Sequence, residues 1–263
     1  MIIKKKAIPI ILFVFLQSCG ANIITNQSLL GEWIGAENNK LYFSFETDRC
    51  YYLSAWGNFS LYTLNDSVII ITDTIKGPHS KEFRESKFRI LKLKDNELEL
   101  FTEYAPLYTN LDTIKLKRIK PNSIMDFKII EFESSGCFGS CPSMKLKINQ
   151  NFEIFYEGRN YTEKNGYYSG KITSSQMERL KRKLSLVDFK SLQENYEAMW
   201  TDDQTCDISI LTNDTVYTSS VYGFDKEPFE LRILFNELME LYKHTEMNKD
   251  SSHHFYYDDF FNE

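Results

Sequence analysis

The feature that most constrains the fold is a series of short strand-like segments between residues 29 and 119, with no helical period among them. In KLYFSFET (40–47), Leu41, Phe43 and Phe45 alternate with more polar residues, which is the period of a half-buried strand. Similar segments surround it: LLGEWIGA, RCYYLSAW, NFSLYTLN, SVIIITDT, KFRILKLK, ELELFTEY and TIKLKRI. The series predicts an all-β antiparallel fold over residues 29–119, either an up-and-down barrel or a strongly bent sheet.

The first of these segments adds a resemblance. Gly31, Glu32 and Trp33 resemble the G-x-W of lipocalin-like domains, in which the Trp closes one end of the barrel. The resemblance implies a lipocalin-like barrel, and a small apolar ligand is then one candidate partner. The aromatic content of 15% also favours β-structure, because flat side chains pack well on pleated surfaces.

The pattern changes after KPNS (120–123), which we interpret as a linker. Strand-like segments now alternate with two helical periods. One helix is predicted over 173–189, capped by Ser174 or Ser175, and another from Pro228 to about His244. We therefore predict a separately folding α+β domain over residues 124–247, with an antiparallel sheet and two helices. Residues 248–263 have no period and are interpreted as a loosely ordered tail.

The N-terminus reads as an export signal. Three lysines precede an apolar run from Ala7 to Leu16, which is shorter than the about 20 residues that cross a bilayer. LQSC (16–19) resembles a bacterial lipobox, which implies cleavage before Cys19 and acylation of its thiol. Residues 1–18 are then a lipoprotein signal peptide and 19–28 a tether. The alternative is an ordinary signal peptide with an incidental cysteine.

The export signal and the lipobox-like LQSC predict a lipid-anchored protein of the bacterial envelope. Gly20, and not Asp, follows Cys19, which favours the outer membrane. The formal charge is −6, and no cluster of Lys and Arg lies outside the first six residues, so nucleic acid is excluded as a partner. No cofactor or metal site is predicted.

SSGCFGSCPS (134–143) is the most unusual stretch of the chain. A disulfide between Cys137 and Cys141 is our first choice, because exported proteins meet oxidising conditions and the flanking glycines allow a tight loop. The alternatives are a redox centre, a zinc site or a cysteine nucleophile, but the spacing is not C-x-x-C and no His or second Cys pair accompanies it. Cys50 and Cys206 are predicted to be reduced and buried.

Several motifs in the second half occur in a recognisable order: CFGSCP, YEG, YYSGKIT, VDF, TDD and VYG. Together they resemble a family of bacterial extracytoplasmic domains of unknown function that is marked by C-F-G-x-C-P. The resemblance covers residues 124–247. It implies a small α+β module that often occurs in lipoproteins, and it implies no particular activity.

YEAMWTDDQ (196–204) is a second candidate site. Tyr196 and Trp200 would stack on a ligand, while Asp202 and Asp203 bind a cation or a hydroxyl. The alternative is a turn in which the Asp side chains cap the backbone and Trp200 packs beneath them.

These observations favour a binding module without catalytic activity, anchored in the envelope by its N-terminal lipid. Its partner would be a small apolar ligand or another envelope protein. One alternative is a thiol–disulfide or hydrolytic enzyme of the envelope. Another is an immunity or inhibitor protein that blocks a secreted partner.

Overall fold

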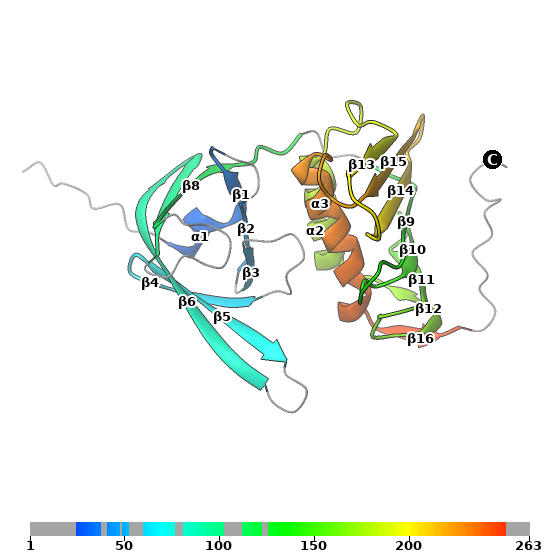
Figure 1. Ribbon diagram of the computed structural model, residues 1–263, viewed down its shortest axis with the longest axis horizontal. Coiled ribbons are helices and arrows are strands. Elements are labelled where there is room, and N and C mark those ends of the chain that lie inside the picture. The colour runs from blue at the N-terminus through cyan, green and yellow to red at the C-terminus, as the bar shows by residue number, and fades with distance from the viewer. Residues whose placement is uncertain are drawn as a thin grey trace, which may run out of the picture.

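The computed structural model describes residues 25–37, 41–47, 49–52, 60–76, 81–102, 112–122 and 126–250. It consists of a β-barrel, a second sheet and two helices that lie between them (Figure 1). Residues 1–18, Cys19 and the tail after residue 250 lie outside the described residues. Within the described ranges, no helix has the length and apolar character needed to cross a membrane.

The first part of the chain is a closed antiparallel barrel of eight strands, which follows the up-and-down order of the sequence. The strands are β1 (Gly31–Gly35), β2 (Tyr42–Phe45), β3 (Arg49–Tyr52), β4 (Ser60–Asn65), β5 (Val68–Lys76), β6 (Lys81–Lys94), β7 (Glu97–Phe101) and β8 (Thr113–Arg118). Pairing of β1 with β8 closes the barrel. The antiparallel barrel is therefore confirmed. The short helix α1 (Asn26–Leu29), which the strand pattern did not predict, precedes it.

Aromatic side chains pack with aliphatic ones in the barrel interior. Phe43 lies 5.8 Å from Phe45 and 5.6 Å from Phe88 between ring centroids. Trp33 is fully buried beside them, and its indole nitrogen donates to the backbone oxygen of Leu29 in α1, at 2.8 Å. These contacts make this part of the barrel a packed core.

The side chain of Arg118, in the last strand, covers Trp33 of the first strand. The guanidinium of Arg118 lies 4.1 Å from the centre of the Trp33 ring. It also donates to the backbone oxygens of Ser28, at 2.9 Å, and of Leu30. Arg118 therefore ties α1 and the entry of β1 to the last strand.

The second part contains an eight-stranded sheet in the order β13-β15-β14-β9-β10-β11-β12-β16. The strands are β9 (Ile129–Ser134), β10 (Met144–Asn149), β11 (Glu153–Gly158), β12 (Gly166–Lys171), β13 (Asn195–Glu197), β14 (Thr205–Leu211), β15 (Val216–Tyr222) and β16 (Met247–Lys249). The last strand includes Asn248 and Lys249, which the sequence assigned to the tail.

The prediction of a purely antiparallel second sheet is wrong at one edge, where β13 runs parallel to β15. The reason lies in the strand order. β14 and β15 form an antiparallel hairpin, so they run in opposite directions. β13 runs opposite to β14 but pairs with β15, and it is therefore parallel to its neighbour.

Two helices, α2 (Ser174–Leu186) and α3 (Phe229–Leu241), cover one face of this sheet (Figure 1). A 3-10 turn, η1 (Tyr242–His244), continues α3. The cap of α2 is Thr173 and not Ser174 or Ser175, because its side chain accepts from Gln176 N while the Gln176 side chain accepts from Thr173 N. This reciprocal pair is a capping box.

The other side of the two helices packs on the outer surface of the barrel. A buried apolar cluster joins Ile34, Tyr42 and Tyr51 of the barrel to Leu186 at the end of α2 and to α3. The predicted half-buried β2 is therefore buried on both faces. The alternation correctly predicted a strand, but the helical residues that cover its outer face lie far away in the sequence.

A buried ion pair lies at the same interface. The Lys183 ammonium donates to Glu32 Oε1 at 2.5 Å and to Ser44 Oγ at 2.9 Å, and the Tyr42 hydroxyl donates to the other oxygen of Glu32. Burial raises the pKa of Glu32, but the charge and hydrogen bond of Lys183 outweigh it, so the pKa lies below its ordinary value. These contacts couple the barrel to the second part, in contrast to the separate folding predicted from the sequence, and we expect the two parts to unfold together.

Candidate functional site

The loops at one end of the second sheet bring the two sequence motifs together. β9, β11, β13 and β15 all run towards this end, as the pairing of neighbouring strands shows. The connections over 135–143, 159–165, 198–204 and 223–228 consequently meet there. We call this end of the sheet the tip.

The disulfide loop forms the centre of the tip. Cys137 and Cys141 are bonded, with their Cα atoms 5.6 Å apart, so the predicted disulfide is present. The loop is also held at its base. The side-chain amide of Gln204 donates to the backbone oxygens of Ser135, at 2.9 Å, and Pro142, at 2.7 Å.

The disulfide loop is hydrogen-bonded to the segment that contains Trp200. The backbone nitrogen of Phe138 donates to the backbone oxygen of Asp202 at 3.0 Å. Thr205 N donates to Ser135 Oγ at 2.9 Å. The sequence indicated these two motifs separately, and the fold makes them one structure.

Trp200 is held in a fixed position at the tip although its side chain is partly exposed. Its indole nitrogen donates to Asp203 Oδ2 at 2.8 Å. Asp203 Oδ1 accepts from Gln204 N at 2.7 Å, and Asp203 N donates to the hydroxyl of Tyr222 at 3.1 Å. The Trp200 ring lies against Gly223, where an added Cβ would come within 2.9 Å of the indole nitrogen.

The predicted set of Tyr196, Trp200, Asp202 and Asp203 is not assembled as a single site. Tyr196 lies in the core, 7% exposed, and its hydroxyl accepts from Gln193 N at 2.9 Å. The Asp203 carboxylate holds the loop, as in the turn interpretation. Asp202 is exposed and has a left-handed backbone with φ 67°. Of the predicted residues, Trp200 and Asp202 therefore remain at the surface.

Large apolar side chains are exposed on these loops. Phe138 is 92% exposed, Met199 87%, Tyr161 67% and Trp200 46%. The loop of Tyr161 is joined to the end of the disulfide loop, because Ser143 N donates to Asn160 O at 2.8 Å. We call these four residues the tip surface. Several exposed apolar residues on hydrogen-bonded loops at one end of a sheet make that end a candidate contact site for another molecule.

Sequence reasoning singled out only Trp200 among the four. Phe138 was the strongest missed signal, since a large apolar residue between the two cysteines of a five-residue loop has little core to enter. Tyr161 and Met199 carry no such signal, because their exposure depends on loops whose positions are set by the strand order.

The free thiols among the described residues do not contribute reactive groups. Cys50 and Cys206 are reduced and buried, as predicted. Burial raises the pKa of both, which keeps them as neutral thiols at physiological pH. Among the residues that the structure describes, no three His, Cys, Asp or Glu side chains converge as ligands for a metal ion.

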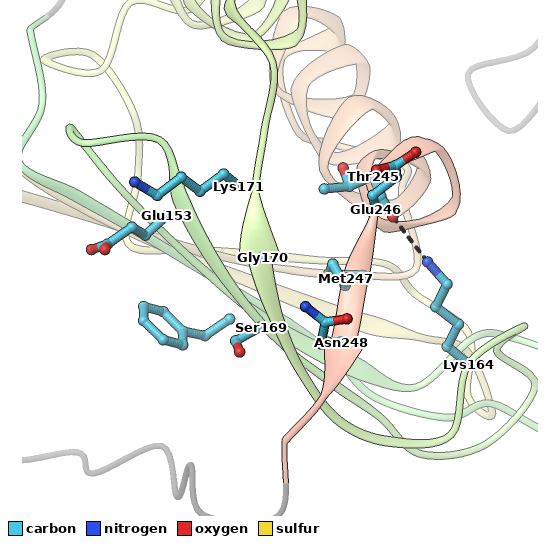
Figure 2. A pocket seen from close by; sticks show the side chains of 10 residues that line it. Glu153, Lys164, Ser169, Gly170, Lys171, Thr245, Glu246, Met247 and Asn248 are labelled. Atoms are coloured by element: carbon cyan, nitrogen blue, oxygen red, sulfur yellow. Dashed lines mark hydrogen bonds between the residues drawn. The ribbon is translucent and has the colours of Figure 1, made fainter.

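A groove of about 910 Å³ lies beside β12 and β16, with Lys164, Lys171 and Glu246 among its lining residues (Figure 2). The Lys164 ammonium donates to the backbone oxygens of Tyr242, at 3.1 Å, and Thr245, at 3.0 Å. This lysine satisfies carbonyl groups at the end of η1, which is a structural role. The groove is therefore a weaker candidate for a binding site than the tip.

A comparison with family models matches residues 128–242. Residues 128–242 form a DUF6438 domain, a domain of unknown function. The DUF6438 domain contains both helices and the strands β9 to β15, and therefore the whole tip, whereas the barrel precedes it. None of the curated proteins matches the chain.

Proposed function

We propose that the protein is a membrane-anchored envelope lipoprotein that binds another envelope protein through the tip surface and has no catalytic role. The observation that carries this proposal is the exposure of Phe138 and Met199 on loops fixed by a disulfide and by hydrogen bonds. Aromatic residues and Met are enriched in protein interfaces. A loop that is already ordered loses little entropy when it binds.

In this proposal, the anchor is the acylated Cys19, and the location is the outer membrane. Stable anchoring takes more than one acyl chain, which the lipid of a bacterial lipoprotein supplies. The signal-like residues 1–18 and the lipobox-like LQSC support the proposal. It predicts that the Cys19→Ala protein accumulates with its signal peptide uncleaved.

We assign the barrel a lipocalin-like architecture and a scaffold role. The packing of Arg118 on Trp33, and the up-and-down strand order, support the first assignment. The aromatic rings that fill the interior around Phe43 favour a scaffold over a carrier of small apolar ligands. An inhibitor or immunity protein is one form that the proposed protein binding can take.

Site-specific photo-crosslinking in cells that produce the full chain tests the proposal. A photoreactive amino acid replaces Met199 in the tip, and in a control it replaces Val216, which is 43% exposed at the opposite end of β15. We expect a protein adduct from position 199 and none of comparable yield from position 216. Equal yields at both positions, or no adduct at 199, would contradict the proposal.

A further inference from the structure

Carboxylates accompany the apolar side chains at the tip. Asp202 is exposed and lies two residues after Trp200, and its backbone oxygen accepts from Phe138 N. Glu197, at the end of β13, and Asp225, in the connection after β15, are exposed at the same end of the sheet. The apolar surface therefore has an acidic margin.

The nearby cations are largely engaged within the fold. The Arg159 guanidinium donates to Glu133 at 2.6 Å and to Glu157 at 3.0 Å. The Lys164 ammonium is bound to two backbone oxygens of the η1 region. Lys226 is exposed, but it directly follows Asp225 in the chain. The local charge around Trp200 is consequently negative.

Trp200 adds a specific preference to this charge. Its indole N–H donates to the Asp203 carboxylate, which fixes the ring and leaves part of it exposed. An aromatic face attracts a cation through its quadrupole, and Trp does so most strongly. A guanidinium can stack on such a ring while its N–H groups reach a carboxylate, which a compact ammonium does less well.

We propose that the partner protein presents a cationic side chain, Arg in preference to Lys, flanked by apolar residues. The cation stacks on Trp200 beside Asp202, and the flanking residues pack on Phe138 and Met199. This proposal rests on the proposed function, because it names the chemistry of the partner at the same surface. An anionic lipid headgroup does not fit, since Asp202, Glu197 and Asp225 would repel it.

The test compares adduct yield from a photoreactive residue at position 199 in three backgrounds: unchanged, Asp202→Asn and Asp214→Asn. Asp202→Asn removes one carboxylate at the tip, and Asn tolerates the left-handed backbone of this position. Asp214→Asn is the matched control, because Asp214 is exposed in the hairpin at the opposite end of the sheet. An unchanged urea midpoint, read from tryptophan fluorescence, verifies that each variant is folded.

We expect Asp202→Asn to lower the adduct yield by up to about fivefold, the upper end for an exposed charge pair, and Asp214→Asn to leave it unchanged. The yield should also fall as NaCl is raised, because salt screens exposed charges. Peptide sequencing of the adduct should find Arg or Lys within about five residues of the cross-link, the reach of a short extended segment.

The outcomes separate this inference from the function on which it rests. A strong protein adduct at 199 that is indifferent to Asp202→Asn and to salt leaves protein binding intact and overturns the cationic partner. A yield that increases in Asp202→Asn indicates an anionic partner and overturns it as well. An adduct with lipid at position 199, or no adduct, contradicts the proposed function itself.

Discussion

At the scale of single residues, the conformation of the tip depends on Gly223, and the atoms around this residue explain why it is a glycine. Gly223 has φ 75°, and a Cβ there would lie 2.6 Å from the Cβ of Ala198 and 2.9 Å from the Trp200 indole nitrogen. Any side chain at this position would displace Trp200 or the backbone. The position of Trp200 at the tip is thus set partly by the absence of a side chain at residue 223.

We predict that Gly223→Ala lowers the free energy of unfolding by about 1–3 kcal/mol, through backbone strain and overlap with Trp200. Urea denaturation followed by tryptophan fluorescence measures the change. Gly136→Ala in the disulfide loop is the control, because an added Cβ there meets no atom within 4 Å. Equal destabilisation by both substitutions would contradict this account of Gly223.

The disulfide should contribute to binding more than to stability. Its loop closes over a sequence separation of 4, so the entropy that it removes from the unfolded chain is small. We predict that Cys137→Ser with Cys141→Ser lowers the free energy of unfolding by at most about 2 kcal/mol. The same change should reduce the cross-link yield at the tip. A stability loss much larger than this would mean that the disulfide holds the domain together.

At the scale of elements, the start of α2 shows how a cap is selected. The sequence offers Thr173, Ser174 and Ser175 in succession, and all three can cap a helix. Thr173 becomes the cap because Gln176, three residues later, completes the reciprocal pair. The Gln176 amide also donates to the backbone oxygen of His244 at 3.1 Å, which ties the start of α2 to the end of η1.

Thr173→Ala should therefore lower the free energy of unfolding by about 1 kcal/mol, whereas Ser174→Ala should change it by a few tenths only. Thermal or urea denaturation of the two variants side by side measures the difference. Equal effects would mean that the helix starts one residue later than Thr173 specifies.

The elements also show how far sequence reasoning reaches. Alternation in segments such as Leu41–Phe45 predicted the barrel strands, because one face of each strand must be buried in the interior. The parallel pairing of β13 and the burial of both faces of β2 could not be predicted from the sequence. Each depends on which distant element lies beside the strand, and the spacing of apolar residues within one segment carries no information on that.

The candidate site divides in the same way. The Cys137–Cys141 disulfide was predictable because its partners are neighbours in the chain. The contact of Phe138 N with Asp202 O was not, since it depends on β14 pairing with β9. Tyr196 was misplaced for a related reason. In a short edge strand, one residue is buried and its neighbours are exposed, and the strand itself was not recognised.

At the scale of the whole molecule, the buried pair of Lys183 and Glu32 links the barrel to the DUF6438 domain. Removing one member of a buried pair leaves the other charged and unsatisfied, which costs about 3–5 kcal/mol. We predict a loss of this size for Lys183→Met. Combining it with Glu32→Leu should recover much of the stability, since an apolar pair leaves no buried charge.

The measurement is a denaturation curve for each single variant and for the double variant. Lys181→Met provides a control on the same helix, because Lys181 forms only an exposed pair with Asp126, at 3.5 Å. If Lys183→Met unfolds at the same denaturant concentration as the unchanged chain, the two parts are not held together by this pair.

The same interface should make the fold sensitive to acid. The pKa of Glu32 is lowered in the folded state, so its contribution to stability is complete above the ordinary carboxyl pKa. It is lost as the pH falls below that value towards the lowered pKa. We expect the acid-dependent loss of stability to shrink in Glu32→Gln, measured as the unfolding midpoint from pH 7 to pH 3. An unchanged pH dependence would exclude Glu32 as its source.

Protein binding by the tip surface is tested most directly by the dissociation constant of the partner identified by cross-linking. We predict that Phe138→Ala with Met199→Ala weakens binding by at least about tenfold, because exposed anchors of this kind dominate interface energies. Leu61→Ala with Leu91→Ala, at barrel positions 64% and 52% exposed, should leave the constant within about twofold. Unchanged binding by the tip variant, or equal weakening by the barrel variant, would contradict the account.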